Sequence, residues 1–165
     1  MGNEGTLSKD VLSKLSDPEK VLAGLKGGQG GQVLFDYSDE VMETLYKKAH
    51  HFLEERKTNE AIDSFVFLVT LNAFHSEYWM GLGAALQMAH DYEAAIDAYE
   101  IAAIYNIEHP LPYLYLAKCL FAIHDRKSAL QSLELAIAYA GDVEEYASIR
   151  TEAENARDSL QKLID

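Results

Sequence analysis

Apolar residues along the chain recur at steps of three and four, the spacing that places side chains on one face of an α-helix. No strand-like alternation of apolar and polar residues stands out. Between about residues 38 and 141, the helical segments form three successive pairs joined by short turns. The pattern therefore predicts an all-α protein.

The three helix pairs share one pattern with a period of 34 residues. Six columns repeat at that step: Leu45, Trp79 and Tyr113; Ala49, Gly83 and Ala117; Phe52, Leu86 and Leu120; Ala61, Ala95 and Ala129; Phe65, Tyr99 and Leu133; and Leu68, Ala102 and Ala136. This combination of period and residue types is the tetratricopeptide signature. Small residues let paired helices approach closely, and stacking of repeats buries the large ones. We expect a superhelix of three helix-turn-helix repeats at about 42–75, 76–109 and 110–141, within a unit spanning residues 32–141.

Capping residues set the expected helix boundaries. Ser38 is expected to cap the first helix of the first repeat, and Ser76 the first helix of the second repeat. The second helices of the three repeats are expected at about 59–71, 92–105 and 127–140.

The N-terminal leader, residues 1–31, has its own apolar stripe. The stripe consists of Leu7, Val11, Leu15, Leu22 and Leu25, and a Gly-rich stretch at 26–31 follows it. This predicts an amphipathic helix and a flexible linker. Because so short a helix is unstable alone, it must pack on the repeats or on a second copy of itself. An apolar cluster at 33–37 is expected to dock on the first helix of the first repeat.

The last segment, residues 142–165, departs from the repeat pattern. Its small-residue column would fall on Thr151. It still carries an apolar stripe with a charged back: Tyr146, Ile149, Ala153, Ala156, Leu160 and Leu163. A solenoid requires a polar-faced terminal element, so this segment is expected to form a C-terminal capping helix.

Charge and composition narrow the classes of partner. The 165 residues carry a net charge of −13, which disfavours nucleic acids and anionic membranes as partners. No apolar run approaches the ~18 residues of a membrane span, so we expect no membrane insertion and a cytoplasmic protein. Cys119 is the one cysteine, which excludes an intramolecular disulfide, and we expect it to be a small buried residue.

Candidate chemistry is sparse. His75 and His109, like His90 and His124, are 34 residues apart, so stacking separates each pair by roughly 10 Å, too far for one zinc ion. Gly27–Gly31 lacks the preceding strand and the Gly-Lys-Ser/Thr ending of a phosphate loop. No nucleophile–base pair is visible. We expect no metal, no cofactor and no enzymatic activity.

A surface remains as the candidate site. Positions two, five, nine and twelve of each first helix line the inner, concave face of a tetratricopeptide stack, and their spacing keeps them on one helix face. The candidate peptide-binding residues there are Tyr46, His50, Leu53, Met80, Ala84, Gln87, Leu111, Leu114, Lys118 and Phe121. This lining favours an apolar groove for an extended segment, although the leader or a neighbouring chain could cover part of it. With Lys118 as the single basic residue, a clamp for an acidic carboxyl terminus is not expected.

The chain resembles the class II chaperones of bacterial type III secretion, the LcrH/SycD-like translocator chaperones. The resemblance covers about residues 33–160 and rests on these blocks: Leu45-Tyr46-x-x-Ala49, Gly81-Leu82-Gly83-Ala84, Tyr92-x-x-Ala95-Ile96, Ile107-Glu108-His109-Pro110 and Ala117-Lys118-Cys119-Leu120. Three repeats between a variable N-terminal helix and a C-terminal helix are also that family's layout. The Gly-rich linker departs from the family pattern, and His50 and Leu53 stand where relatives commonly have aromatic residues.

The resemblance implies a non-catalytic chaperone of the bacterial cytosol. It would hold hydrophobic translocator proteins or other secreted effectors before export, a role in virulence. Binding would use an extended P-x-L-x-x-P-like segment along the concave groove, and the resemblance also implies a homodimer through the N-terminal helices. A permanent scaffold subunit that joins folded proteins is the alternative.

Overall fold

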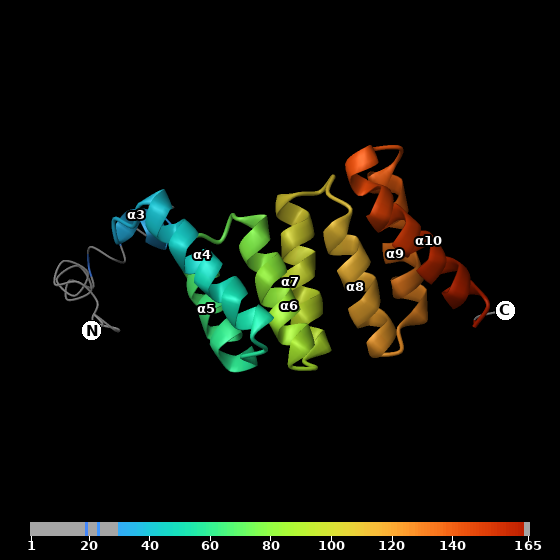
Figure 1. Cartoon of the computed structure of the whole chain (residues 1–165), viewed down its shortest axis with the longest axis horizontal. Coiled ribbons are helices and arrows are strands. Elements are labelled where there is room, and N and C mark those ends of the chain that lie inside the picture. Colours follow the sequence, from blue (N-terminus) through green and yellow to red (C-terminus); the bar gives the residue numbers. More distant parts are fainter. Residues whose placement is uncertain (1–18, 20–22, 24–29, 164–165) are drawn as a thin grey trace.

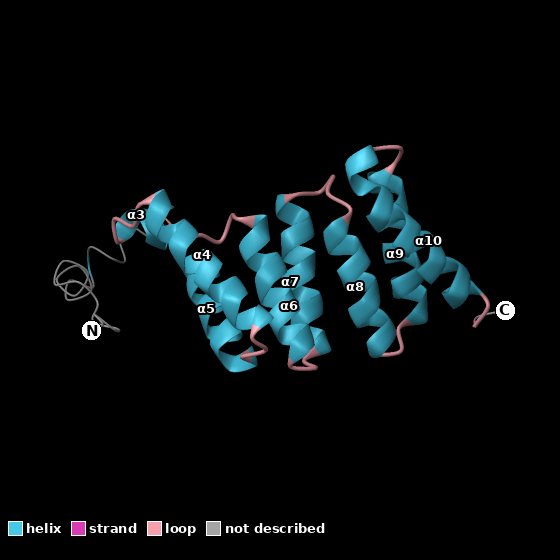
Figure 2. Cartoon of the chain, in the orientation of Figure 1, coloured by secondary structure: helices cyan, strands magenta, loops and turns pink. Residues whose placement is uncertain are grey.

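The computed structural model describes residues 19, 23 and 30–163 of the 165-residue chain. In this part of the chain every regular element is helical, and short loops join the helices (Figure 2). The three pairs are α4 (Asp39–Glu54) with α5 (Thr58–Leu71), α6 (Ser76–Met88) with α7 (Tyr92–Tyr105), and α8 (Leu111–Ala122) with α9 (Arg126–Ala140). The predicted all-α tetratricopeptide fold is confirmed.

The helix pairs stand side by side in one row, with α3 (Gly31–Leu34) at one end of that row and α10 (Ala147–Gln161) at the other (Figure 1). Substantial contacts between the described helices join only α-helices that are adjacent or next but one along the chain. The first helices of neighbouring repeats, α4 and α6, also touch directly. This is the arrangement of a solenoid, in which each repeat is supported by its neighbours.

The repeated columns form the core. All members of the columns at Ala49, Ala61, Phe65 and Leu68 are buried in all three repeats. Gly81 and Gly83 bring α6 close to its neighbours: a Cβ on Gly81 would lie 2.0 Å from the Phe65 ring, and one on Gly83 would lie 2.6 Å from the Tyr99 ring. Glycine is therefore needed at both positions for helix packing.

The turns inside the three repeats share one backbone conformation. Arg56, His90 and His124, each 34 residues from the next, have φ values of 57°, 62° and 66°. In the second repeat, the Asp91 N–H donates to the Leu86 carbonyl (3.0 Å) and the His90 N–H to the Gln87 carbonyl (3.0 Å). The other two turns have the same bonds. This is the Schellman ending of a helix, with a non-glycine residue in the left-handed position.

Of the two serines predicted to cap helices, Ser38 does so and Ser76 does not. Ser38 Oγ accepts from the Val41 N–H (3.3 Å), as predicted for an N-cap. The capping role predicted for Ser76 was wrong, because Ser76 is the first helical residue of α6 and makes no side-chain cap bond. Its hydroxyl instead donates to the Ala102 carbonyl of α7 (2.8 Å), so it joins the two helices of the second repeat.

The N-terminal flank includes α3 (Gly31–Leu34), so Gly31 belongs to a helix and not to the predicted linker. α3 packs mainly against α5, the second helix of the first repeat. It also reaches the predicted first helix, because Gln32 Nε2 donates to Asp39 Oδ1 at the start of α4 (2.7 Å). Tyr37 meets the Phe67 ring of α5 at a centroid distance of 6.5 Å. The apolar stripe of the leader and linker residues 26–29 lie outside the described residues.

The C-terminal flank consists of η1 (Glu144–Tyr146) and α10 (Ala147–Gln161), and α10 packs against α9 and α8. The apolar stripe faces this contact. Ala153 and Leu160 are buried, with Ile149 and Ala156 half-buried beside them, whereas Leu163 is 55% exposed. No described helix is long and apolar enough to cross a membrane.

Candidate functional site

A groove of about 330 Å³ lies across the first helices of the three repeats. Residues of α4, α6 and α8 form its sides, and Tyr99 reaches it from α7. Its lining consists of Tyr46, His50, Ser76, Glu77, Met80, Gly81, Ala84, Tyr99, Asn106, His109, Leu111, Pro112 and Tyr115. We call this surface the groove.

Five of the predicted peptide-binding residues meet in the groove: Tyr46 and His50 from α4, Met80 and Ala84 from α6, and Leu111 from α8. The two residues from α4 are four positions apart, as are the two from α6, so each pair shares a helix face. Residues from repeats up to 65 positions apart in the sequence therefore line one surface.

The other five predicted residues lie elsewhere. Leu53 packs against the core of the first repeat, and the Gln87 side-chain oxygen accepts from the Tyr99 hydroxyl (3.0 Å). Leu114, Lys118 and Phe121 line a separate pocket between α8 and the C-terminal helix. Leu114 is also only 2% exposed, so it is largely a core residue.

Aromatic rings form the α4 side of the groove. Tyr46 meets His50 at 4.5 Å and Tyr78 at 5.5 Å between ring centroids, and His50 stands edge-on to Phe65 at 5.4 Å. Burial raises the pKa of the Tyr46 hydroxyl to about 12, with smaller contributions from the charges of Glu77 and Glu43. The side of the groove is thus neutral, aromatic and held in place by core packing.

A few polar groups interrupt this apolar lining. His50 Nε2 is buried and makes no hydrogen bond to the described residues, so this ring contributes packing rather than an exposed polar group. His109 Nδ1 accepts from the Leu111 N–H (3.2 Å), which fixes that ring at the start of α8. Among the described residues lining the groove, Glu77 is the one with a formal charge at neutral pH when histidine is counted as neutral. The groove thus combines apolar contact with hydrogen-bonding positions.

Several groove residues were missing from the sequence prediction. Ser76, Tyr99, Asn106, His109 and Tyr115 lie outside the four inner positions of each first helix. The signal for Tyr99 was present, because it stands in a repeated column opposite Gly83, whose missing side chain leaves room for its ring. The Tyr115 ring stacks on Tyr99 at 5.5 Å, a contact that helix spacing alone does not reveal.

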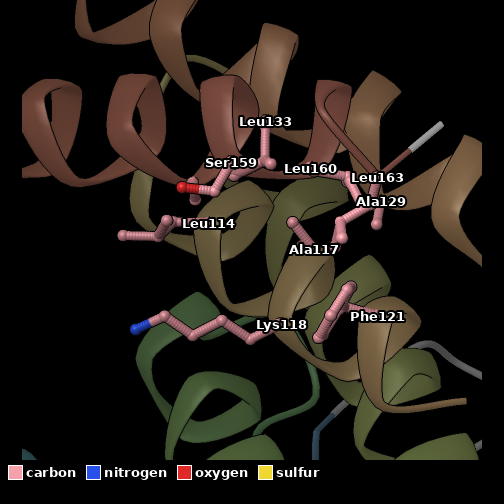
Figure 3. A pocket seen from close by; sticks show the side chains of 10 residues that line it. Leu114, Ala117, Lys118, Phe121, Ala129, Leu133, Ser159, Leu160 and Leu163 are labelled. Atoms are coloured by element: carbon pink, nitrogen blue, oxygen red, sulfur yellow. The ribbon is translucent and has the colours of Figure 1, made fainter. Parts of the chain in front are cut away.

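The second pocket, of about 230 Å³, is bounded by α8, α9 and α10 (Figure 3). We call it the C-terminal pocket. Its lining consists of Leu114, Ala117, Lys118, Phe121, Ala129, Leu133, Ala156, Ser159, Leu160 and Leu163. Lys118 Nζ forms an ion pair with Glu152 of α10 (2.7 Å) and lies 4.7 Å from the centroid of the Tyr115 ring.

The chemistry of these surfaces is that of binding. No group of three or more potential metal ligands occurs among the residues that the structure describes. Cys119 is buried, as predicted, and burial raises the pKa of its thiol to about 11, which disfavours the reactive thiolate. Apolar side chains with a few hydrogen-bonding groups suit an extended polypeptide segment.

Comparisons with known proteins agree with this fold. The tetratricopeptide repeat family matches residues 76–108, and a search of curated proteins finds no match. A T3SS complex from Aeromonas hydrophila has a TM-score of 0.83 and 25% identity over 90% of this chain and 99% of that chain. The Yersinia enterocolitica type III secretion translocator chaperone SycD has a TM-score of 0.76 and 25% identity, over 79% of this chain and 97% of its own.

The same Yersinia chaperone, in complex with a peptide of the translocator YopD, matches with a TM-score of 0.75 and 25% identity. That match covers 78% of this chain and 98% of the chaperone. These comparisons confirm the predicted similarity to type III secretion translocator chaperones.

Proposed function

We propose that this chain is a type III secretion chaperone of the bacterial cytosol. It binds hydrophobic translocator or effector proteins through the groove and keeps them soluble and competent for secretion. The observation that supports this most is the match to SycD over nearly the whole of that chaperone, including a complex with a translocator peptide. The groove, with an aromatic side and few charges, supports this proposal because it suits an apolar client.

The client binds as an extended segment of the P-x-L-x-x-P type. Its prolines preset an extended backbone and so reduce the ordering entropy lost on binding. An extended backbone has no internal hydrogen bonds, so an exposed polar group of the lining such as the Asn106 amide can bond to it. An affinity on the order of micromolar, about −8 kcal/mol, is expected for a short segment.

Groove variants test this function by titration calorimetry with a client P-x-L-x-x-P peptide. Met80→Ala and Tyr46→Ala should each weaken binding by about 1–3 kcal/mol, as removal of an interface anchor does. Leu114→Ala is unsuitable, because loss of a core leucine typically costs about 2–5 kcal/mol of folding stability. Asp97→Ala and Glu100→Ala, at exposed positions of α7 outside the groove, are matched controls. Equal losses in groove variants and controls would contradict the proposal.

The chaperone is also proposed to form a homodimer through its leader. A solved form of SycD is described as an alternative dimer, which supports self-association in this class. A chain that starts near Gln32 should shift toward monomer in sedimentation experiments. An unchanged mass at all concentrations would exclude the leader as the dimer element.

A scaffold role makes a different prediction about the fate of the complex. A chaperone releases its client before the client is exported, whereas a scaffold remains in the final assembly. Proteins that co-purify from the host, compared with those in the secreted fraction, distinguish the two. Recovery of this chain inside a stable assembly, with no effect of its deletion on client solubility, would favour the scaffold.

A further inference from the structure

Helix α8 contributes to two surfaces on neighbouring faces. Leu111 and Tyr115 line the groove, whereas Leu114 and Phe121 line the C-terminal pocket. Lys118 connects them, because it lines the pocket while its Nζ lies 4.7 Å from the centroid of the Tyr115 ring. The two surfaces are therefore adjacent at Lys118 and Tyr115.

The interior of the C-terminal pocket is apolar. Its volume exists because alanines line part of the walls contributed by α8, α9 and α10, at Ala117, Ala129 and Ala156. An apolar cavity of about 150 Å³ in another protein holds benzene, so about 230 Å³ leaves room for an aliphatic or aromatic side chain. The two apolar side chains Phe121 and Leu163 are 48% and 55% exposed on the lining, available to a bound group.

The polar groups of the pocket lie at its edge. In Figure 3 the Lys118 side chain extends along one side, with its nitrogen pointing away from Phe121. That nitrogen is paired with Glu152 at 2.7 Å. The Ser159 hydroxyl donates to the Asn155 carbonyl within α10 (2.8 Å). A polar side chain placed inside would lose its hydration without gaining a partner, whereas an apolar one would gain burial.

We propose that the C-terminal pocket binds one large apolar side chain, such as leucine, isoleucine or phenylalanine, from the same client segment that occupies the groove. This inference rests on the proposed chaperone function and extends it. The client class becomes an extended segment with an additional apolar anchor outside its P-x-L-x-x-P core. In this view α10 caps the solenoid and also forms one wall of a specificity pocket.

The experiment uses titration calorimetry on the full chain with synthetic peptides. The parent peptide has a P-x-L-x-x-P core between flanks of alternating serine and alanine. In each further peptide, one flanking residue is replaced by leucine. The peptide with leucine at one particular flank position should bind about tenfold tighter than the parent peptide, because one more aliphatic side chain is buried. Leucine at flank positions that do not reach the pocket should bind like the parent.

Variants then show where the gain arises. Phe121→Ala removes an exposed part of the lining, and Ala156→Phe fills the pocket. In both, the ratio of affinities between the leucine peptide and the parent should fall from about ten to near one. Leu135→Ala, 43% exposed on α9 and outside both pockets, is the matched control and should keep the full ratio. Met80→Ala should weaken both peptides by the same factor and leave the ratio unchanged.

The outcomes separate the two proposals. If the parent peptide does not bind, the groove function fails, and the anchor fails with it. If the parent binds but no flank leucine helps, or the gain persists in both pocket variants, only the anchor is overturned. A gain seen only after removal of residues 1–29 would mean that the leader fills the pocket, and would also overturn the proposal. Circular dichroism melting verifies folding, and Phe121→Ala tests the pocket even if Ala156→Phe does not fold.

Discussion

Gly81→Ala adds a single methyl group where the structure has no room for it. The new Cβ would lie 2.0 Å from Cε1 and 2.3 Å from Cζ of Phe65, closer than real Cβ contacts come. Phe65 has no exposed surface, and its ring already meets Tyr46 and His50, at centroid distances of 6.3 and 5.4 Å. Relief of the clash must therefore displace rings that form the side of the groove.

Two opposing effects set the magnitude. Overpacking a well-packed core typically costs about 1–3 kcal/mol, and a contact this short with a buried ring belongs at or above the upper end. Alanine in place of glycine inside a helix returns about 1 kcal/mol. We expect a net loss of about 2 kcal/mol, which lowers the melting temperature by roughly 4–8 °C in a chain of this size. Urea and thermal unfolding, followed by far-ultraviolet circular dichroism, measure it.

A double-mutant cycle with Phe65→Leu shows whether the ring causes the loss. Phe65→Leu alone should destabilise the protein, because it leaves a cavity beside Gly81. With both changes, the methyl group occupies part of that cavity, so the double variant should be at least about 1 kcal/mol more stable than the sum of the single effects predicts. A Gly81→Ala protein as stable as the parent, or strictly additive effects, would refute this reasoning.

Three further predictions concern the turns, the Tyr46 hydroxyl with the Cys119 thiol, and the last helix. Arg56→Gly and His124→Gly should each raise the free energy of unfolding by up to about 1 kcal/mol, because the left-handed conformation costs non-glycine residues roughly 1–2 kcal/mol. Urea unfolding should therefore show a higher midpoint, and a lower midpoint would contradict this. Burial raises the pKa of Tyr46 to about 12 and that of Cys119 to about 11, so both groups ionise more readily in the unfolded chain. The stability they contribute is therefore complete below about pH 9 and falls as the pH rises toward 11–12. Urea titrations at pH 8 and 10.5 should show this decrease in the free energy of unfolding, and an unchanged value would count against it. Ala153→Asp should destabilise the α9–α10 contact by several kcal/mol because Ala153 has no exposed surface, whereas Asn155→Asp on the exposed side of α10 should change the melting temperature little.

Much of the fold follows from the sequence because the packing itself repeats. The residues at Ala61, Ala95 and Ala129 are buried for the same reason in each copy, so a 34-residue period reveals all of them together. Helix α7 begins and ends at the predicted residues. Asp91 fixes its start, because the Asp91 side chain accepts from the Ala94 N–H in the first turn. The role of Ser76 could not be read this way, because its hydroxyl bonds to a carbonyl 26 residues away.

The site was less predictable than the fold, for a physical reason. Inner positions derived from the repeat assume that each first helix has an equivalent neighbour. After the third repeat, the helix in the place of the next first helix is α10, and α10 does not follow the repeat pattern. Leu114 and Phe121 therefore face a pocket formed by three helices, and Leu114 is almost fully buried there. The placement of those residues depends on how α10 docks, which the repeat does not specify. Peptide binding at the remaining positions stays a prediction.

Contacts restricted to near neighbours along the chain also shape how the protein folds. Because the described helices join only to those one or two places away, few contacts close long loops, and the cost in loop entropy is small. Proteins with such low contact order fold in microseconds to milliseconds. Each repeat can pack as soon as the next one has been synthesised, because its partners lie close to it in the sequence. Amide hydrogen exchange should then be slowest in α6 and α7, which are supported on both sides, and should speed up toward both ends of the row.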